Sequence, residues 1–318
     1  MAPVSSLLLR DLLSMIIRPK LHWLRMLFVW RGSLLNRILP QLFLLVSLAT
    51  LVVVVHHYYP GLLPDLTPLP FTLLGIALAI FLSFRNSVSY DRFWEARKLW
   101  GAVLNETRTL TRQQLTAADA SDEQNRQFVY SLIAFVHALR AQLRHTDATP
   151  ALQQLLRPEA VTQVIKGRFK PELVVLDLAQ QLRTMRKQEQ LCPILFARMD
   201  QHLSQLSACL GGCERIASTP VPFAYSVILH RTVYTYSFLL PLGLVATLGF
   251  MTPLIVVFVA YTFLALEALA EELQDPFGTE PNDLALDAMT NMIESALREM
   301  LGEEIGSPPV VPENCVVT

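Results

Sequence analysis

Charged side chains are missing from a long stretch in the second half of the chain. Between Thr232 and Leu266 there is no Asp, Glu, Lys or Arg. The hydrocarbon core of a bilayer takes about 20 residues of helix to cross, so this stretch is too long for a single span. Gly249 and Pro253 interrupt it, and these residue types break helical runs at turns. The pattern predicts an integral membrane protein with a helical hairpin hinged between Gly249 and Pro253.

The chain also has little net charge and few cysteines. Its net charge is −1, and it has four cysteines in 318 residues. Nucleic-acid binding usually comes with a strong basic excess, and four cysteines are too few to indicate a disulfide framework. Cys209 and Cys213 stand four positions apart on an expected helix, but no histidine or second cysteine pair has zinc-ligand spacing. We therefore expect no nucleic-acid partner and no metal site.

Motifs of enzyme active sites are missing as well. The sequence has no Gly-rich phosphate loop, no Gly-x-Ser-x-Gly turn and no His-Glu-x-x-His pair. Its seven histidines are scattered. His56 and His57 stand beside Tyr58 and Tyr59 at the end of an apolar run, where amphipathic side chains settle at a membrane interface. We expect no catalytic residues, no cofactor and no enzymatic activity.

Two further charge-free apolar segments lie near the N-terminus, from Ile38 to Pro64 and from Leu66 to Phe84. Neither has the features of a cleaved signal peptide, because a long segment precedes the first and no small-residue cleavage site follows a short apolar run near the start. The second continues from Arg85 as a charged helical pattern. We expect this helix to leave the membrane without ending and to pack among other helices.

Basic residues predict the orientation of these spans. The segment before the first span has six of them and one acid, Asp11, whereas the loop between the first two spans, His56 to Pro70, has none. The six are Arg10, Arg18, Lys20, Arg25, Arg31 and Arg37. Cytoplasmic segments carry the excess of Lys and Arg. We therefore expect a multi-pass protein of the cell inner (plasma) membrane, in contact with lipid, with four spans in two hairpins and both termini cytoplasmic.

The region between the hairpins is long enough to form a domain. Phe128–Leu143 and Leu195–Leu210 have apolar residues at helical spacing, and no segment alternates as a strand would. Ser121 or Asp122 is suited to cap the helix that follows. The sequence predicts an all-α protein in five segments. These are a cytoplasmic N-terminal segment 1–37, a first transmembrane hairpin 38–85, a helical cytoplasmic domain 86–228, a second transmembrane hairpin 229–270 and a cytoplasmic C-terminal segment 271–318.

One face of the second span is uniformly apolar. Ile76, Ile80 and Phe84 recur every four residues and so stack along one helix face, while small residues such as Gly75 allow close approach of another helix. Two interpretations are open. The stripe is either ordinary helix packing or, if copies of the helix surround an axis, a hydrophobic constriction that gates by dewetting.

Three acidic residues, Glu267, Glu271 and Glu272, follow the fourth span. Their spacing is compatible with paired carboxylates or with a helix end in water. We favour the solvated helix end.

Several motifs together resemble one family. They are Pro70-Phe71-Thr72-Leu73-Leu74-Gly75-Ile76, Phe84-Arg85-Asn86-Ser87-Val88-Ser89-Tyr90-Asp91-Arg92-Phe93-Trp94-Glu95-Ala96-Arg97-Lys98-Leu99-Trp100-Gly101, Arg215-Ile216-Ala217-Ser218-Thr219-Pro220-Val221-Pro222-Phe223-Ala224-Tyr225-Ser226, Asp275-Pro276-Phe277-Gly278 and the opening Ile17-Arg18-Pro19. The set resembles the bestrophin family in its bacterial branch, over about residues 15 to 300.

The resemblance implies a homopentameric ion channel whose helices surround one central pore. The family's pore neck corresponds to Ile76, Ile80 and Phe84, and its cytosolic aperture corresponds to Ile194. Chains related by closed rotational symmetry would enclose a path that four spans of one chain do not. The implied partners are further copies of the chain, membrane lipid and permeant monovalent ions.

The sequence departs from the family's animal members in two respects. The neck has one aromatic residue, and only Glu280 and Asp283 follow Asp275-Pro276-Phe277-Gly278 before Asp287, where animal members have a dense acidic calcium clasp. Ca²⁺ takes six to eight oxygen ligands, so we do not expect calcium gating. The family favours passive chloride conduction, with monovalent cation (sodium) conduction through the same pore as the alternative. A transporter or a membrane scaffold is the remaining alternative.

Overall fold

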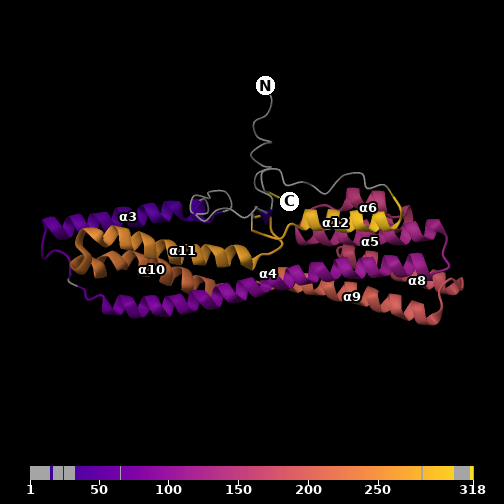
Figure 1. Cartoon of the computed structure of the whole chain (residues 1–318), viewed down its shortest axis with the longest axis horizontal. Coiled ribbons are helices and arrows are strands. Elements are labelled where there is room, and N and C mark those ends of the chain that lie inside the picture. Colours follow the sequence, from indigo (N-terminus) through magenta and orange to yellow (C-terminus); the bar gives the residue numbers. More distant parts are fainter. Residues whose placement is uncertain are drawn as a thin grey trace, which may run out of the picture. The chain divides into compact units, whose positions relative to one another are not determined.

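The structure is a computed structural model, and it describes residues 15–16, 24, 33–64, 66–280, 282–303 and 316–317. Most of the segment 1–37 lies outside the described residues, including the Ile17-Arg18-Pro19 motif and every basic residue of that segment except Arg37. The elements are β1 (Met15–Ile16), α3 (Leu35–Tyr58), α4 (Leu69–Ala117), α5 (Asp122–Leu143), α6 (Thr149–Leu155), α7 (Pro158–Lys166), α8 (Lys170–Lys187), α9 (Pro193–Ser218), α10 (Phe223–Leu248), the 3-10 turn η1 (Gly249–Met251), α11 (Thr252–Gln274), α12 (Leu286–Met300) and β2 (Val316–Val317) (Figure 1).

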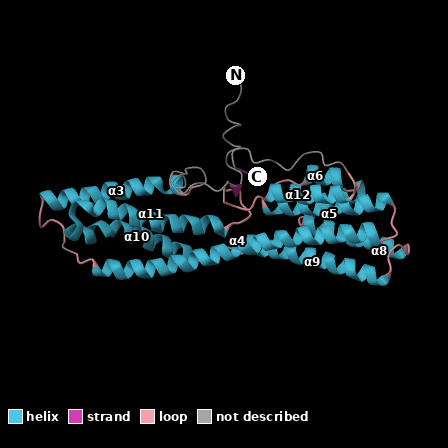
Figure 2. Ribbon diagram, viewed as in Figure 1, coloured by secondary structure: helices cyan, strands magenta, loops and turns pink. Residues whose placement is uncertain are grey.

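Helix is the predominant structure of the described residues (Figure 2). The prediction of a helical chain is confirmed with one small addition. β1 and β2 pair in an antiparallel manner, with Met15 opposite Val317 and Ile16 opposite Val316. Two residues on each strand are too few to form a sheet that would change the fold class.

Contacts divide the chain into two compact units. The apolar unit comprises Pro19–Phe93 and Pro220–Asp275, and the bundle unit comprises Met1–Arg18, Trp94–Thr219 and Pro276–Thr318. Helix α4 belongs to the apolar unit up to Phe93 and to the bundle unit from Trp94. The five segments expected from the sequence stay a prediction.

Three helical stretches of the described residues are long and apolar enough to cross a membrane, namely α3, α4 and Phe223–Gln274. Helix α3 has 24 residues, which at about 1.5 Å per residue span about 36 Å against a hydrocarbon core of about 30 Å. The third stretch is not a single rod, because η1 separates α10 from α11 and these two helices pack against each other. A helical hairpin in this stretch, as predicted, is therefore confirmed.

The hinge of this hairpin depends on glycine. Gly249 has a φ of 52°, in the left-handed region that glycine adopts without steric cost. Its N–H donates to the carbonyl of Val245 at the end of α10, and its own carbonyl accepts from Oγ1 of Thr252 at 2.7 Å. Pro253 then lies in the first turn of α11, where its missing N–H costs no helical hydrogen bond.

The core of the apolar unit is formed mainly by α3, α10 and α11. Two residues of α4, Leu78 and Leu82, belong to it and are buried at 1% and 0% exposure. The other core residues are Ile38, Leu42, Leu45, Ala49, Leu229, Val233, Tyr236, Leu240, Val256, Ala260, Phe263, Leu264 and Ala268. Helix α4 therefore contributes one narrow face to this core.

Helix α5 begins at a well-defined cap in the bundle unit. Oγ of Ser121 accepts a hydrogen bond from the N–H of Gln124, and Oε1 of Gln124 accepts one from the N–H of Ser121. This reciprocal capping box satisfies two donors that the first turn would otherwise leave free. Of the two caps expected from the sequence, the structure has Ser121, and Asp122 is the first residue of the helix.

Helix α5 is the central helix of the bundle unit. It contacts α6, α8, α9 and α12 (Figure 1). Its apolar residues are buried around most of its circumference, as a helix surrounded by others requires. They include Phe128, Val129, Leu132, Ile133, Phe135, Val136 and Leu139. The helical windows predicted at 128–143 and 195–210 are thus confirmed as parts of α5 and α9.

Candidate functional site

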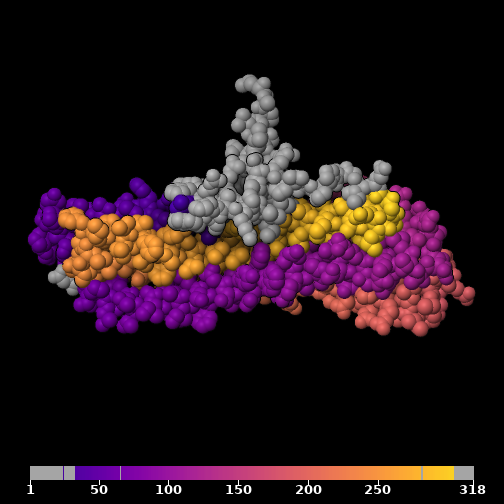
Figure 3. Space-filling view, viewed as in Figure 1, coloured from indigo at the N-terminus to yellow at the C-terminus, as the bar shows by residue number. Residues whose placement is uncertain are grey.

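An apolar stripe runs along the first part of α4. Ile76, Ile80 and Phe84 lie on one face of this helix, because they recur every fourth residue. Their exposed fractions are 55%, 51% and 63%, whereas Leu78 and Leu82 on the opposite face are buried. Figure 3 shows this part of α4 along the surface of the apolar unit. The stripe therefore does not belong to the chain's own core.

Close contacts with α10 fix the rotation of α4 about its axis. A Cβ atom added to Gly75 would lie 2.8 Å from Oη of Tyr236. A Cβ atom added to Gly243 would lie 2.3 Å from the ring of Phe71. Both approaches are shorter than the contacts of real Cβ atoms, so small residues are required where the two helices meet. With this face held against α10, the stripe is directed away from it.

A buried charged cluster follows the stripe directly. Arg85 is the residue after Phe84, and its Nη1 lies 4.0 Å from Oε1 of Glu267 in α11. The same carboxylate oxygen lies 2.7 Å from Nδ1 of His230 in α10. Arg85 and Glu267 are 4% and 8% exposed. Buried charge in a membrane protein is costly unless it is paired, so these side chains hold α4, α10 and α11 together next to Phe84.

The amide of Asn86 adds a second link to α11. Its Nδ2 donates to the carbonyl of Leu266 at 3.0 Å and to the carbonyl of Leu82 at 2.9 Å. Asn86 thus hydrogen-bonds to α11, and Arg85 lies within ion-pair distance of it. The rotation of α4 is set by polar contacts at this point and by close packing at Gly75.

The prediction of a solvated helix end was wrong for Glu267. Its side chain is buried between three helices, because at this position α11 faces Arg85 and His230 rather than water. Glu271 does match the prediction of an exposed residue. It pairs with Arg37 at 2.7 Å, and both side chains are about half exposed.

The residue expected at the cytosolic aperture belongs to the bundle unit. Ile194 is the second residue of α9 and is 77% exposed. The helix begins there because Pro193 occupies the first position and Sγ of Cys192 accepts a hydrogen bond from the N–H of Leu195 at 3.4 Å. An isoleucine side chain so exposed contributes little to the packing of its own unit.

Metal ligands are not grouped in the part of the chain that the structure describes: no three His, Cys, Asp or Glu side chains there could hold an ion. Cys209 and Cys213 are both buried in α9. Burial raises the pKa of the Cys213 thiol to about 12 and also raises the pKa of Cys209. A thiol binds metal as the thiolate, so this pair is suited to packing.

Sequence reasoning placed the stripe residues on one helix face but did not find the charged cluster beside it. A weak signal was present, because Arg85 follows one apolar segment and Glu267 ends another. Many such residues lie in water at the ends of membrane helices, and only the packing of α4 against α11 distinguishes the two cases.

Comparisons with known proteins agree with this architecture. A family model described as bacterial and fungal bestrophin protein matches residues 15–299. A voltage-dependent anion channel-forming protein of Ralstonia nicotianae is 48% identical over 296 residues, covering 91% of this chain and 95% of the relative. A protein of the same description from Escherichia coli K12 is 44% identical over 299 residues, covering 94% of this chain and 98% of the relative.

A solved structure is similar as well. The crystal structure of a bacterial bestrophin homolog from Klebsiella pneumoniae has a TM-score of 0.81 and 46% sequence identity, covering 84% of this chain and 99% of that one. The family model spans nearly all of the chain, and both curated relatives are similar over almost their full length. The resemblance seen in the motifs is confirmed, and the chain belongs to the bestrophin family in its bacterial and fungal branch.

Proposed function

We propose that the chain forms an ion channel that passively conducts monovalent ions, chloride foremost, across the cell inner membrane. The observation that carries this proposal is the exposed apolar stripe of Ile76, Ile80 and Phe84 in the unit that contains the membrane-spanning helices. Relatives described as anion channel-forming proteins, at 44% and 48% identity, support it.

The proposed channel is a homopentamer in which copies of α4 line one central pore. Closed rotational symmetry brings the same face of each copy to the axis, and a ring of Ile76, Ile80 and Phe84 side chains would form a hydrophobic neck. Such a constriction gates by excluding water when it is narrow. The contacts of Gly75 and Arg85 support this role, because they hold α4 at one rotation.

Ile194 is proposed as a second constriction, at the cytosolic aperture. Its side chain is among the most exposed large apolar groups of the described residues. A ring of isoleucines would narrow the path without offering a binding group to the ion. The proposed topology places both termini in the cytoplasm, which fusions of a reporter active only in that compartment would test.

The proposal also specifies that the permeant ion is an anion rather than a cation. The positive edges of the Phe84 rings favour anions, as do the descriptions of the relatives. Ile76 and Ile80 provide no ring edges, and this observation keeps monovalent cation (sodium) conduction as the second candidate. The two candidates share the same pore and differ in a single measurable quantity.

The decisive experiment is the reversal potential of the purified protein in a planar bilayer under a KCl gradient, repeated with NaCl. We expect a value near the chloride equilibrium potential in both salts. A value near the cation equilibrium potential would be consistent with the proposed channel but would overturn its proposed anion selectivity. No current from the wild type or from Ile80→Ala would overturn the channel and leave a transporter or scaffold.

A further inference from the structure

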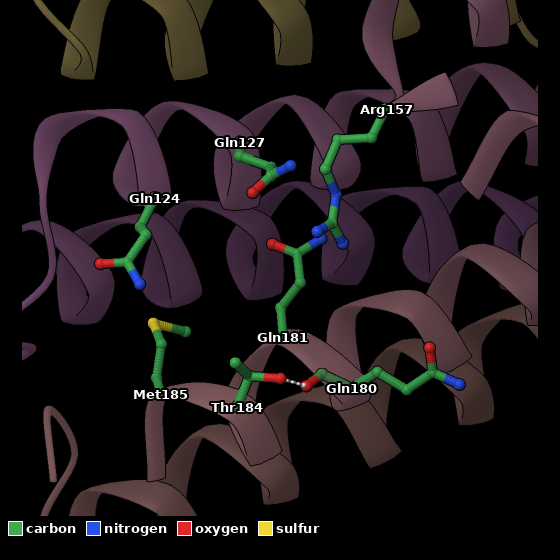
Figure 4. Close-up of a pocket in the computed structure, with 7 residues that line it drawn as sticks. All are labelled: Gln124, Gln127, Arg157, Gln180, Gln181, Thr184 and Met185. Atoms are coloured by element: carbon green, nitrogen blue, oxygen red, sulfur yellow. Dashed lines mark hydrogen bonds between the residues drawn. The ribbon is translucent and has the colours of Figure 1, made fainter. Parts of the chain in front are cut away.

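A polar cleft in the bundle unit has no role in the proposed pore. It has a volume of about 310 Å³, within the range of small-molecule sites. Its lining comes from the start of α5, the residue before α7 and the second half of α8. The lining residues are Gln124, Gln127, Arg157, Gln180, Gln181, Thr184 and Met185 (Figure 4).

The amide of Gln181 has a defined orientation. Its Nε2 donates to Oδ2 of Asp177 at 2.7 Å and to Oγ of Ser131 at 2.9 Å. A carboxylate such as that of Asp177 only accepts hydrogen bonds, so the nitrogen must lie on that side. The carbonyl oxygen is therefore directed the other way, into the space beside Gln127 and Met185 (Figure 4).

This oxygen accepts no hydrogen bond from a described residue, although Gln181 as a whole is only 9% exposed. It is open to the cleft, where water or a ligand reaches it. The cleft thus offers an acceptor that a hydroxyl or ammonium group of a ligand would satisfy.

The guanidinium of Arg157 provides the complementary donors. Its Nη2 donates to Oδ1 of Asp177 at 3.2 Å, and the side chain is 45% exposed. Arginine has five N–H donors, and the remaining ones have no hydrogen bond to any described residue. Figure 4 shows the guanidinium beside the Gln181 amide. Because Asp177 balances its charge, the cleft is not a general anion site, and recognition needs donor and acceptor together.

We propose that this cleft binds a small carboxylate that also carries a hydroxyl or ammonium group. The carboxylate pairs with Arg157, and the hydroxyl or ammonium donates to Oε1 of Gln181. The thioether of Met185 contacts the carbon skeleton of the ligand. The Gln127 amide lines the cleft above Gln181 in the view of Figure 4, and it has no hydrogen bond to a described residue. A ligand bound in this way bridges α7 and α8 and is independent of the pore.

Thermal unfolding of the full-length protein in detergent tests this proposal with three probes, L-serine, L-lactate and propionate. Serine and lactate carry a carboxylate and a donor, whereas propionate is the matched carboxylate without one. A ligand that binds the folded state raises its melting temperature in a concentration-dependent manner. We expect serine or lactate to bind about tenfold more tightly than propionate, the effect of one additional hydrogen bond.

Two cleft variants and one control variant locate the binding. Arg157→Gln removes the guanidinium and should abolish the shift, while Arg183→Gln makes the same charge change on the exposed face of α8 and should preserve it. Gln127→Leu replaces the polar amide in the cleft wall by an apolar group without breaking a hydrogen bond to a described residue, so it weakens binding of a polar ligand even if Arg157→Gln does not fold. The proposal is overturned by no shift with any probe, by equal shifts with propionate and lactate, or by unchanged shifts in both cleft variants.

Discussion

The carboxylate of Glu267 lies 4.0 Å from the guanidinium of Arg85, and the two side chains are 10% and 5% exposed. Removing one member of a buried pair leaves the other charge without compensation, which costs about 3–5 kcal/mol. We expect Glu267→Gln to lower the melting temperature of the detergent-purified protein markedly. Glu271→Gln is the matched control, because its exposed pair with Arg37 is worth about 0–1 kcal/mol. Equal losses in both variants would contradict a structural role of the buried pair.

Close packing between α4 and α10 gives a second prediction. Gly75→Ala would place a methyl group 2.8 Å from Oη of Tyr236, and such overpacking costs about 1–3 kcal/mol. Tyr236→Phe removes that oxygen, so the double variant should regain most of the lost stability. Thermal melting of the two single variants and the double variant measures the coupling. A double variant no more stable than Gly75→Ala would refute the contact.

The neck hypothesis predicts a change of conductance. Ile80→Ala should widen and wet the constriction and raise the single-channel current in a planar bilayer. Phe81→Ala is the control, because Phe81 is similarly exposed, at 52%, but lies about 100° further around the helix. Unchanged current in Ile80→Ala, or an equal rise in the control, would count against the neck.

The aperture hypothesis predicts an effect on permeation at Ile194. Ile194→Ala should change conductance or the ratio of anion permeabilities, measured from reversal potentials in mixed salts. Leu176→Ala provides a comparison, since Leu176 is a large apolar residue of the same unit that is 52% exposed. If Ile194→Ala lowered only the protein yield, Ile194 would be a structural residue.

An acid-sensitive contact joins α5 and α12. Oε2 of Glu294 lies 2.7 Å from Nε2 of His137, and its Oε1 accepts from Nε of Arg298 at 2.8 Å. The hydrogen bond with His137, together with Arg298, lowers the pKa of Glu294 from 4.5 to about 2. A depressed folded-state pKa contributes stability that is fully present above about 4.5 and is lost as pH falls through about 2.

Glu294→Gln tests this contribution. We expect the variant to melt below the wild type near neutral pH, and the gap between them to narrow as pH falls from about 4.5 toward about 2. Glu299→Gln, an exposed position on the same helix, should show no such narrowing. A gap independent of pH would mean that the carboxylate charge does not contribute.

Much of the fold was predictable because it depends on local pattern. Charge-free runs indicated the spans, Gly249 and Pro253 indicated the hinge, and Ser121 indicated the start of α5. These features depend on hydrophobic length, backbone freedom and capping, all of which involve residues close together in the chain. The β1–β2 pairing was not predicted, since strands of two residues have no periodicity to detect.

The candidate site was likewise predictable only in those features that depend on local sequence. A spacing of four residues was enough to place Ile76, Ile80 and Phe84 on one helix face. Their exposure became visible only with the other helices in place, because a stripe of this kind is equally compatible with burial.

The sequence by itself determined that the chain is helical, that it has spans with a hinge at Gly249, and that α4 carries an apolar stripe. Tertiary structure alone decided that Glu267 is buried against Arg85, that Gly75 meets Tyr236, and that the carbonyl of Gln181 opens into a cleft. Each of these three features depends on which helix faces meet, and the helices concerned are distant from one another in the chain. The contacts between those faces determine which side chains lose water and which hydrogen bonds they form, and neighbours in sequence do not.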